Sequence, residues 1–205
     1  MHASHGSGAS LFPEFHGGTG FPVVALCTSA GGLDALARVL WPLPRDFPAA
    51  VIVSQHLRPS VVSRLPELLQ RHCDLTVRPA SDGDRLTPGH VLVVPEHSHM
   101  LVGADDRVRL IASGELPPAR PSADLLLATM AVALGPRAIA VILTGGGRDG
   151  SVGVRAIGAF GGSVLVQNPD TAFAPGMPRA ALESEGRRSI ALDHIAASLV
   201  DLVTR

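Results

Sequence analysis

One stretch decides the fold: Val23-Val24-Ala25-Leu26-Cys27-Thr28-Ser29-Ala30-Gly31-Gly32, an apolar run that leads directly into a turn containing glycine. Two later segments also begin with an apolar run, and the second of them again leads into glycines. They are Ala50-Val51-Ile52-Val53 before Ser54-Gln55-His56, and Ala140-Val141-Ile142-Leu143 before Thr144-Gly145-Gly146-Gly147-Arg148-Asp149-Gly150. Continuous apolar runs of this kind are typical of parallel strands that helices cover on both faces. The sequence therefore predicts an α/β fold.

The rest of the chain alternates between helix-like and strand-like segments. We expect helices over residues 33–40, 60–72, 122–134, 151–160 and 193–203, with Pro66 kinking or restarting the second of them. Ser122 and Asp193 are suited to begin their helices as caps, and Gly135 to end one. Further strands are expected over residues 75–78, 91–94 and 164–167, and an antiparallel hairpin over 101–103 and 107–111. The predicted fold class is a three-layer, doubly wound, mostly parallel sheet with the antiparallel hairpin at one edge.

A serine, a histidine and an acid follow the three apolar runs: Ser29, His56 and Asp149. In open α/β sheets, chemistry usually takes place beyond the carboxyl ends of the strands. Nucleophilic acyl transfer needs a hydroxyl, a base that takes its proton and a carboxylate that orients the base. Each residue alone also has an ordinary interpretation, as a helix cap, a structural histidine or an Asp-Gly turn. Their conjunction favours a hydrolase site.

The chain order Ser, His, Asp differs from that of chymotrypsin-like, subtilisin-like and α/β-hydrolase enzymes, and no Gly-x-Ser-x-Gly elbow surrounds Ser29. The motifs instead resemble the catalytic domain of the CheB-type chemotaxis protein-glutamate methylesterases. The matching motifs run in the same order along the chain: Cys27 to Gly32, Gln55-His56, Pro88-Gly89, His99-Met100, Arg120 to Asp124, Leu143 to Gly150, Gln167-Asn168 and Gly176-Met177-Pro178-Arg179.

The resemblance implies a nucleophile at Ser29, a general base at His56 and an orienting acid at Asp149. It also implies the reaction, which is hydrolysis of glutamate methyl esters, and deamidation of glutamine, on the cytoplasmic helices of a methylated chemoreceptor. No metal and no organic cofactor is required for this chemistry. Backbone amides of the Gly145 to Gly147 turn, or those following Ser29, are candidate donors to the oxyanion.

Three positions depart from the family pattern: Cys27 stands where the family has glycine, Ala30 where it has threonine and Gly146 where it commonly has methionine. These departures leave one alternative open, and the glycine-containing turn leaves a second. One is a catalytically weak module that binds a receptor helix or partner. The other, ranked last, is a nucleotide-binding module that uses the Thr28 to Gly32 turn, although this turn lacks both the Walker lysine pattern and the full dinucleotide glycine pattern.

Length and charge narrow the class of protein. A chain of 205 residues fits one domain, which we expect over residues 22–205 behind a flexible leader over residues 1–21. The net charge of −1 and the absence of a basic stripe argue against a nucleic-acid partner. The sequence has no signal-peptide pattern and no apolar stretch of membrane-spanning length, so we expect a cytoplasmic protein without membrane insertion.

Regulation is the least constrained property. The family's regulated members carry an N-terminal receiver domain, and only a short leader precedes the first strand here, so the resemblance implies no phosphoryl switch within this chain. The protein is then constitutive, regulated by a separate protein, or part of a pathway other than motility. The oligomeric state is open.

The remaining polar candidates receive structural interpretations. His90, His97 and His99 lack the accompanying acids or cysteines of a metal site, which favours packing or hydrogen bonding. Arg120 and Asp124 are expected to brace a loop and a helix start, and Arg179 to do the same or to meet an acidic substrate. Cys27 and Cys73 are expected to be buried free thiols.

Overall fold

Six strands form the central layer of the molecule. The computed structural model describes residues 20–57, 63–114, 120–185 and 189–204. All neighbouring strands pair in parallel, in the order β3-β4-β2-β1-β7-β8. The bounds are β1 Val23–Thr28, β2 Ala50–Gln55, β3 Thr76–Pro79, β4 His90–Val93, β7 Ala138–Ile142 and β8 Ser163–Val166. All six residues of β1 are buried because it lies between β2 and β7 and is covered on both faces.

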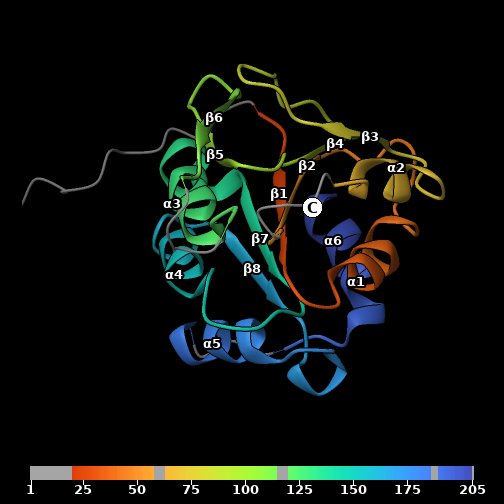
Figure 1. The fold of residues 1–205 in the computed structure, drawn as a ribbon, viewed down its shortest axis with the longest axis vertical. Helices are drawn as coiled ribbons and strands as arrows, with labels where there is room; N and C mark the ends of the chain where they lie inside the picture. Colours follow the sequence, from red (N-terminus) through yellow and green to blue (C-terminus); the bar gives the residue numbers. More distant parts are fainter. Residues whose placement is uncertain (1–19, 58–62, 115–119, 186–188, 205) are drawn as a thin grey trace, which may run out of the picture.

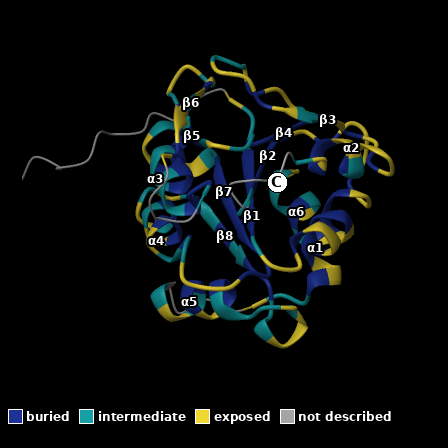
Figure 2. Ribbon diagram, in the orientation of Figure 1, coloured by how far each residue is buried: buried dark blue, intermediate teal, exposed yellow. Residues whose placement is uncertain are grey.

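Helices cover both faces of the sheet, as Figure 1 shows. On one face lie α1 (Gly32–Leu40), α2 (Leu65–Gln70) and α6 (Leu192–Val203), which share an apolar cluster with one side of the strands. The other face carries α3 (Ala123–Leu134), α4 (Ser151–Ala159) and α5 (Gly176–Glu185). Short 3-10 turns follow at Gly135–Arg137 and Pro169–Thr171. In Figure 2 the strands form a buried band between the partly exposed helices, which is the predicted three-layer, doubly wound arrangement.

The antiparallel hairpin is present, but it forms a sheet of its own. Its strands are β5 (Ser98–Val102) and β6 (Val108–Ala112). Neither strand pairs with an edge of the six-stranded sheet in the part of the chain that the structure describes. The hairpin instead turns its apolar residues Met100, Val102 and Val108 into the cluster shared with α3. Burial of these side chains against α3, and not backbone pairing with an edge of the six-stranded sheet, therefore holds the hairpin in place.

Most predicted helices are confirmed, with corrections at their ends. Ser122 begins α3 and its hydroxyl accepts a hydrogen bond from the Leu125 amide. Pro66 lies in the first turn of α2 and starts the helix rather than kinking it, because that turn needs no amide donor there. Residues 60–62 of the expected helix lie outside the described part. Asp193 does not cap α6: Ala191 is the N-cap, and Asp193 pairs with Arg38 of α1.

Helix α5 was not predicted, since Gly176 and Pro178 near its start resemble loop residues. Both are tolerated in a first helical turn. The predicted leader falls almost entirely on residues 1–19, which lie outside the described part, and the boundary at residue 22 remains a prediction. Among the described residues, no helix is long and apolar enough to cross a lipid bilayer.

Candidate active site

The three predicted site residues lie at the same edge of the sheet, where β1, β2 and β7 end. The backbone bonds of the strands continue into these turns: the His56 amide donates to the carbonyl of Thr28 at 3.0 Å, and the Ser29 amide donates to the carbonyl of Thr144 at 3.0 Å. Ser29 therefore lies between the residues that follow β2 and β7. Asp149 comes to this edge at the end of the glycine turn, immediately before α4.

His56 and Asp149 are joined directly. Nε2 of His56 lies 2.8 Å from Oδ2 of Asp149, and the two side chains are 17% and 11% exposed. A carboxylate at that distance favours a proton on Nε2, because the Nε2–H then donates to an ionised acceptor. Among the described residues, Ser29 Oγ makes no hydrogen bond. The structure thus places all three residues at one edge of the sheet and joins the side chains of His56 and Asp149.

Asp149 is held by the amino end of α3. Its Oδ2 accepts from the Ala123 amide at 2.7 Å, and its Oδ1 accepts from the Asp124 amide at 3.0 Å and from the Ser122 hydroxyl at 3.3 Å. Burial acts to raise the pKa of Asp149, but the hydrogen bonds from His56 and from the two amides outweigh it, so the pKa lies below its ordinary value. Asp149 is therefore an ionised acceptor facing His56. Sequence analysis predicted Ser122 as a cap but missed its contact with Asp149, which joins residues distant in the chain.

Glycines allow the turn after β1 to approach its neighbours closely. Gly31 has a positive φ of 78°, and a Cβ at this position would lie 2.6 Å from Cβ of Phe173. Gly145 lies on the other side of Ser29, where a Cβ would come within 2.9 Å of Ser29 Cβ and would collide with the Met177 sulfur. Because real Cβ atoms do not approach heavy atoms this closely, these two glycines set the position of Ser29.

Some backbone amides around Ser29 already donate hydrogen bonds, and others do not. The Gly145 amide donates to the Ala174 carbonyl at 2.8 Å and the Gly32 amide donates to the Ser29 carbonyl at 3.0 Å. Gly145 is therefore not available as an oxyanion donor, contrary to one of the candidates from sequence. The amides of Ala30, Gly146 and Gly147 have no backbone acceptor among the described residues. Gly146 is exposed, and a Cβ there would meet nothing within 4 Å.

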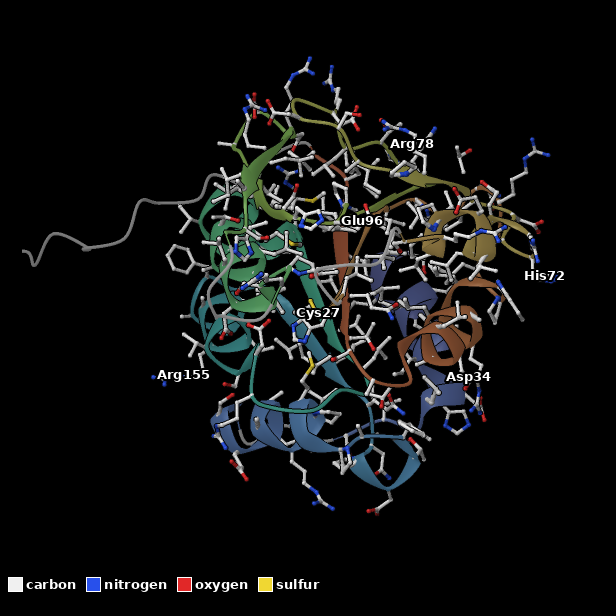
Figure 3. The ribbon with its side chains drawn as sticks, viewed as in Figure 1. Cys27, Asp34, His72, Arg78, Glu96 and Arg155 are labelled. Atoms are coloured by element: carbon white, nitrogen blue, oxygen red, sulfur yellow. The ribbon has the colours of Figure 1, made fainter. Side chains whose placement is uncertain are left out.

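Cys27 lies beneath this edge on the α3 side of the sheet, near the centre of Figure 3. It is fully buried and carries no disulfide, as expected, and Cys73 is also a buried free thiol. Burial, reinforced by the charges of Asp149 and Asp124, strongly raises the pKa of the Cys27 thiol. The thiol therefore stays protonated and does not compete with Ser29 as a nucleophile.

The other predicted polar residues have the following places in the structure. Nδ1 of His99 accepts from the Ser122 amide at 2.9 Å, which confirms hydrogen bonding for this histidine and steadies the start of α3. The Arg120 carbonyl accepts from the Leu57 amide at 2.9 Å, and Arg179 is exposed on α5. His90 Nδ1 lies 3.1 Å from the Pro88 carbonyl. No group of three metal-ligating side chains is present in the part of the chain that the structure describes.

Comparison with known proteins identifies the family of the chain. The family model for CheB methylesterase matches residues 24–199. The chain belongs to the CheB methylesterase family. The crystal structure of the Thermotoga maritima CheB methylesterase catalytic domain superposes with a TM-score of 0.84 at 31% identity, covering 90% of this chain and 100% of that one.

Curated relatives in the CheB methylesterase family include protein-glutamate methylesterase FrzG of Myxococcus xanthus, 38% identical over 89% of this chain and 55% of its own length. Another is protein-glutamate methylesterase/protein-glutamine glutaminase 2 of Pseudomonas aeruginosa, 38% identical over 89% of this chain and 53% of its own. The chain thus spans about half the length of these relatives. Its membership of the CheB methylesterase family confirms the resemblance found from the motifs.

Proposed function

We propose that this chain is a serine hydrolase that removes methyl groups from glutamate methyl esters on the cytoplasmic helices of a chemoreceptor. The observation that carries the proposal is the 2.8 Å contact between His56 Nε2 and Asp149 Oδ2 at the edge of the sheet where Ser29 also lies. Membership of the CheB methylesterase family supports the reaction class, and the names of its relatives support the substrate. The reaction would take place in the cytoplasm, where these receptor helices lie.

In the proposed mechanism, Asp149 holds the proton on Nε2 and leaves Nδ1 of His56 as the base. Nδ1 takes the proton of Ser29 as Oγ attacks the ester carbonyl. The tetrahedral intermediate then collapses, the C–O bond to the methoxy group breaks, and the imidazolium returns the proton so that methanol leaves. Water, deprotonated by the same Nδ1, cleaves the acyl-enzyme and regenerates Ser29. The hydrogen bond between a nucleophile and its base often forms fully only when substrate is bound, and we expect this of Ser29 Oγ and His56 Nδ1.

The oxyanion needs backbone donors that are not already engaged. We assign this role to the Ala30 amide and to an amide of the turn at Gly146 or Gly147, since these have no backbone acceptor in the described part of the chain. The same acyl chemistry releases ammonia from a glutamine side chain, and the relatives named as glutaminases support this second reaction.

The experiment measures methanol release from a methylated chemoreceptor cytoplasmic fragment, and ammonia release from its unmodified glutamine form. Wild type should release both, and Ser29→Ala should release neither while it still binds the fragment. Loss of both activities in Ser29→Ala would support Ser29 as the nucleophile. Full activity in Ser29→Ala would overturn the assignment of the site.

A second candidate is a catalytically weak module that binds the receptor. The bare turn at Gly146, where the family commonly has methionine, and the missing hydrogen bond at Ser29 Oγ favour it. Binding of the fragment by wild type without release of methanol or ammonia would support this candidate and contradict the hydrolase. Regulation by a separate protein would then be tested by adding it to the same assay.

A further inference from the structure

Two helices on the α3 side of the sheet are capped by acids from each other. Asp149, which lies just before α4, accepts from the Ala123 and Asp124 amides at the start of α3. In return, Oδ1 of Asp124 accepts from the Val152 amide at 2.9 Å and from the Gly153 amide at 2.8 Å at the start of α4. Asp124 thus donates its amide to Asp149 and accepts, through its side chain, from the helix that follows Asp149.

Helix α4 has no cap of its own among the residues that begin it. Its N-cap is Gly150, which has a φ of 94° and no side chain, whereas α3 is capped by Ser122. The first amides of a helix have no partner within it, and an acceptor for them stabilises the helix. Asp124 supplies that acceptor to α4.

Close packing brings the two helices to hydrogen-bonding distance. Gly153 lies against α3 so tightly that a Cβ there would come within 2.6 Å of Leu127 Cβ and 3.2 Å of Asp124 Cα. Gly153 is also one of the two amides that Asp124 accepts from. The position of α4 relative to α3 is therefore set in the first turn of α4, directly after Asp149.

Burial and the nearby charge of Asp149 raise the pKa of Asp124, although the amides act in the opposite direction. Asp124 is half buried, and its amide-bound oxygen points to α4 rather than to His56. These contacts are those of a residue that holds backbone in place and not of a group that exchanges protons with substrate.

We propose that Asp124 is a positioning residue: it fixes the start of α4 and thereby holds Asp149 where its carboxylate meets Nε2 of His56. The effect of Asp124 on the reaction rate rests on the proposed function. The effect of Asp124 on the His56–Asp149 hydrogen bond does not depend on the identity of the substrate. Weakening the cap should let the turn that carries Asp149 move, which would lower kcat and leave substrate binding unchanged.

The test compares Asp124→Ala with Asp124→Asn. Both remove the charge, but asparagine keeps an oxygen acceptor for the α4 amides. Methanol release from a methylated receptor fragment should show a kcat at least tenfold lower in Asp124→Ala, with KM within twofold of wild type. Asp124→Asn should stay within threefold of wild type in both constants.

A second readout needs no substrate. The proton of the His56–Asp149 hydrogen bond should give a downfield resonance in the NMR spectrum of wild type that is absent in Asp149→Asn. It should be lost or broadened in Asp124→Ala and kept in Asp124→Asn. If wild type releases no methanol, the proposed function fails, and this resonance still decides the role of Asp124.

The matched control is Asp84→Ala, which removes a carboxylate that accepts from the Ser81 amide and pairs with Arg78. Figure 3 shows Arg78 well away from Cys27. Asp84→Ala should leave kcat and the resonance unchanged. If Asp124→Ala does not fold, Asp124→Glu keeps the charge but displaces the acceptor and should give an intermediate kcat. Wild-type kcat and resonance in Asp124→Ala would overturn the proposal, and so would an equal loss in Asp124→Asn, which would assign the effect to charge.

Discussion

Nε2 of His56 contacts Oδ2 of Asp149 at 2.8 Å, so Nδ1 is the ring nitrogen that remains free to accept a proton. An imidazole has one proton to place when neutral, and the carboxylate draws it to Nε2. The same carboxylate is bound by two amides of α3, which limits its freedom to turn away from His56. The orientation of the base is thus determined by the start of α3, a helix that begins 94 residues after Ser29 in the chain.

Replacing Asp149 by asparagine should reduce kcat for methanol release by about 10³- to 10⁴-fold, because an amide no longer holds the Nε2 tautomer. The amide nitrogen would also face an α3 amide, which should lower the free energy of unfolding by about 1–3 kcal/mol. Steady-state kinetics and urea unfolding measure the two effects. A kcat within tenfold of wild type would contradict the role of Asp149.

Gly145→Ala should impair both folding and activity. Its new Cβ would collide with the Met177 sulfur and lie 2.9 Å from Ser29 Cβ, so Ser29 or α5 must shift. We expect a loss of about 1–3 kcal/mol in the free energy of unfolding and a kcat at least tenfold lower. Gly146→Ala is the control for stability, since its Cβ would meet nothing within 4 Å. It should change the free energy of unfolding by less than about 0.5 kcal/mol, and equal destabilisation by the two changes would argue against this packing.

The lowered pKa of Asp149 predicts a contribution to stability that depends on pH. Its folded pKa lies below the ordinary value of 3.8, so the ionised carboxylate stabilises the folded state fully above that value, and the contribution is lost as pH falls through the folded pKa. The difference in unfolding free energy between wild type and Asp149→Asn should therefore be largest at neutral pH and shrink below the ordinary value. Urea titrations over this range measure it, and a constant difference would count against the ionised contact.

The contribution of Asp124 to stability should depend on pH in the opposite direction to that of Asp149. The folded pKa of Asp124 is raised above 3.8, first by burial, so its protonated form contributes stability that is present below the ordinary pKa and lost as pH rises through the folded pKa. Asp124→Asn should then be at least as stable as wild type at neutral pH, with this advantage vanishing at acidic pH. Thermal unfolding of the two proteins at several pH values tests the sign, and marked destabilisation of Asp124→Asn at neutral pH would refute it.

Neither cysteine should react with a thiol reagent in the folded protein. Burial raises the pKa of both Cys27 and Cys73, and thiolates are the reactive form. Mass spectrometry after brief labelling should find no adduct in native buffer and two adducts in urea. Rapid labelling of Cys27 in the native state would mean that this edge of the sheet opens.

The elements with strong local signals were predicted well. The apolar runs form β1, β2 and β7 because a strand that is buried on both faces favours apolar residues along its length. Ser122 begins α3 and Gly135 ends it, as expected, since caps are made by neighbouring residues. The errors arose where a residue's partner is distant: Asp193 binds Arg38 instead of capping α6, and the hairpin packs on α3 instead of extending an edge.

By itself the sequence determined which strands are buried and that Ser29, His56 and Asp149 follow their carboxyl ends, because both properties come from short apolar runs and the rule that parallel strands share an edge. Only the tertiary structure decided that Nε2 contacts Asp149, that the Gly145 amide is occupied, and that Asp124 and Asp149 cap each other's helices. These depend on hydrogen bonds between segments far apart in the chain, whose ångström-scale geometry follows from packing, as at Gly153 against Leu127, and has no local signature.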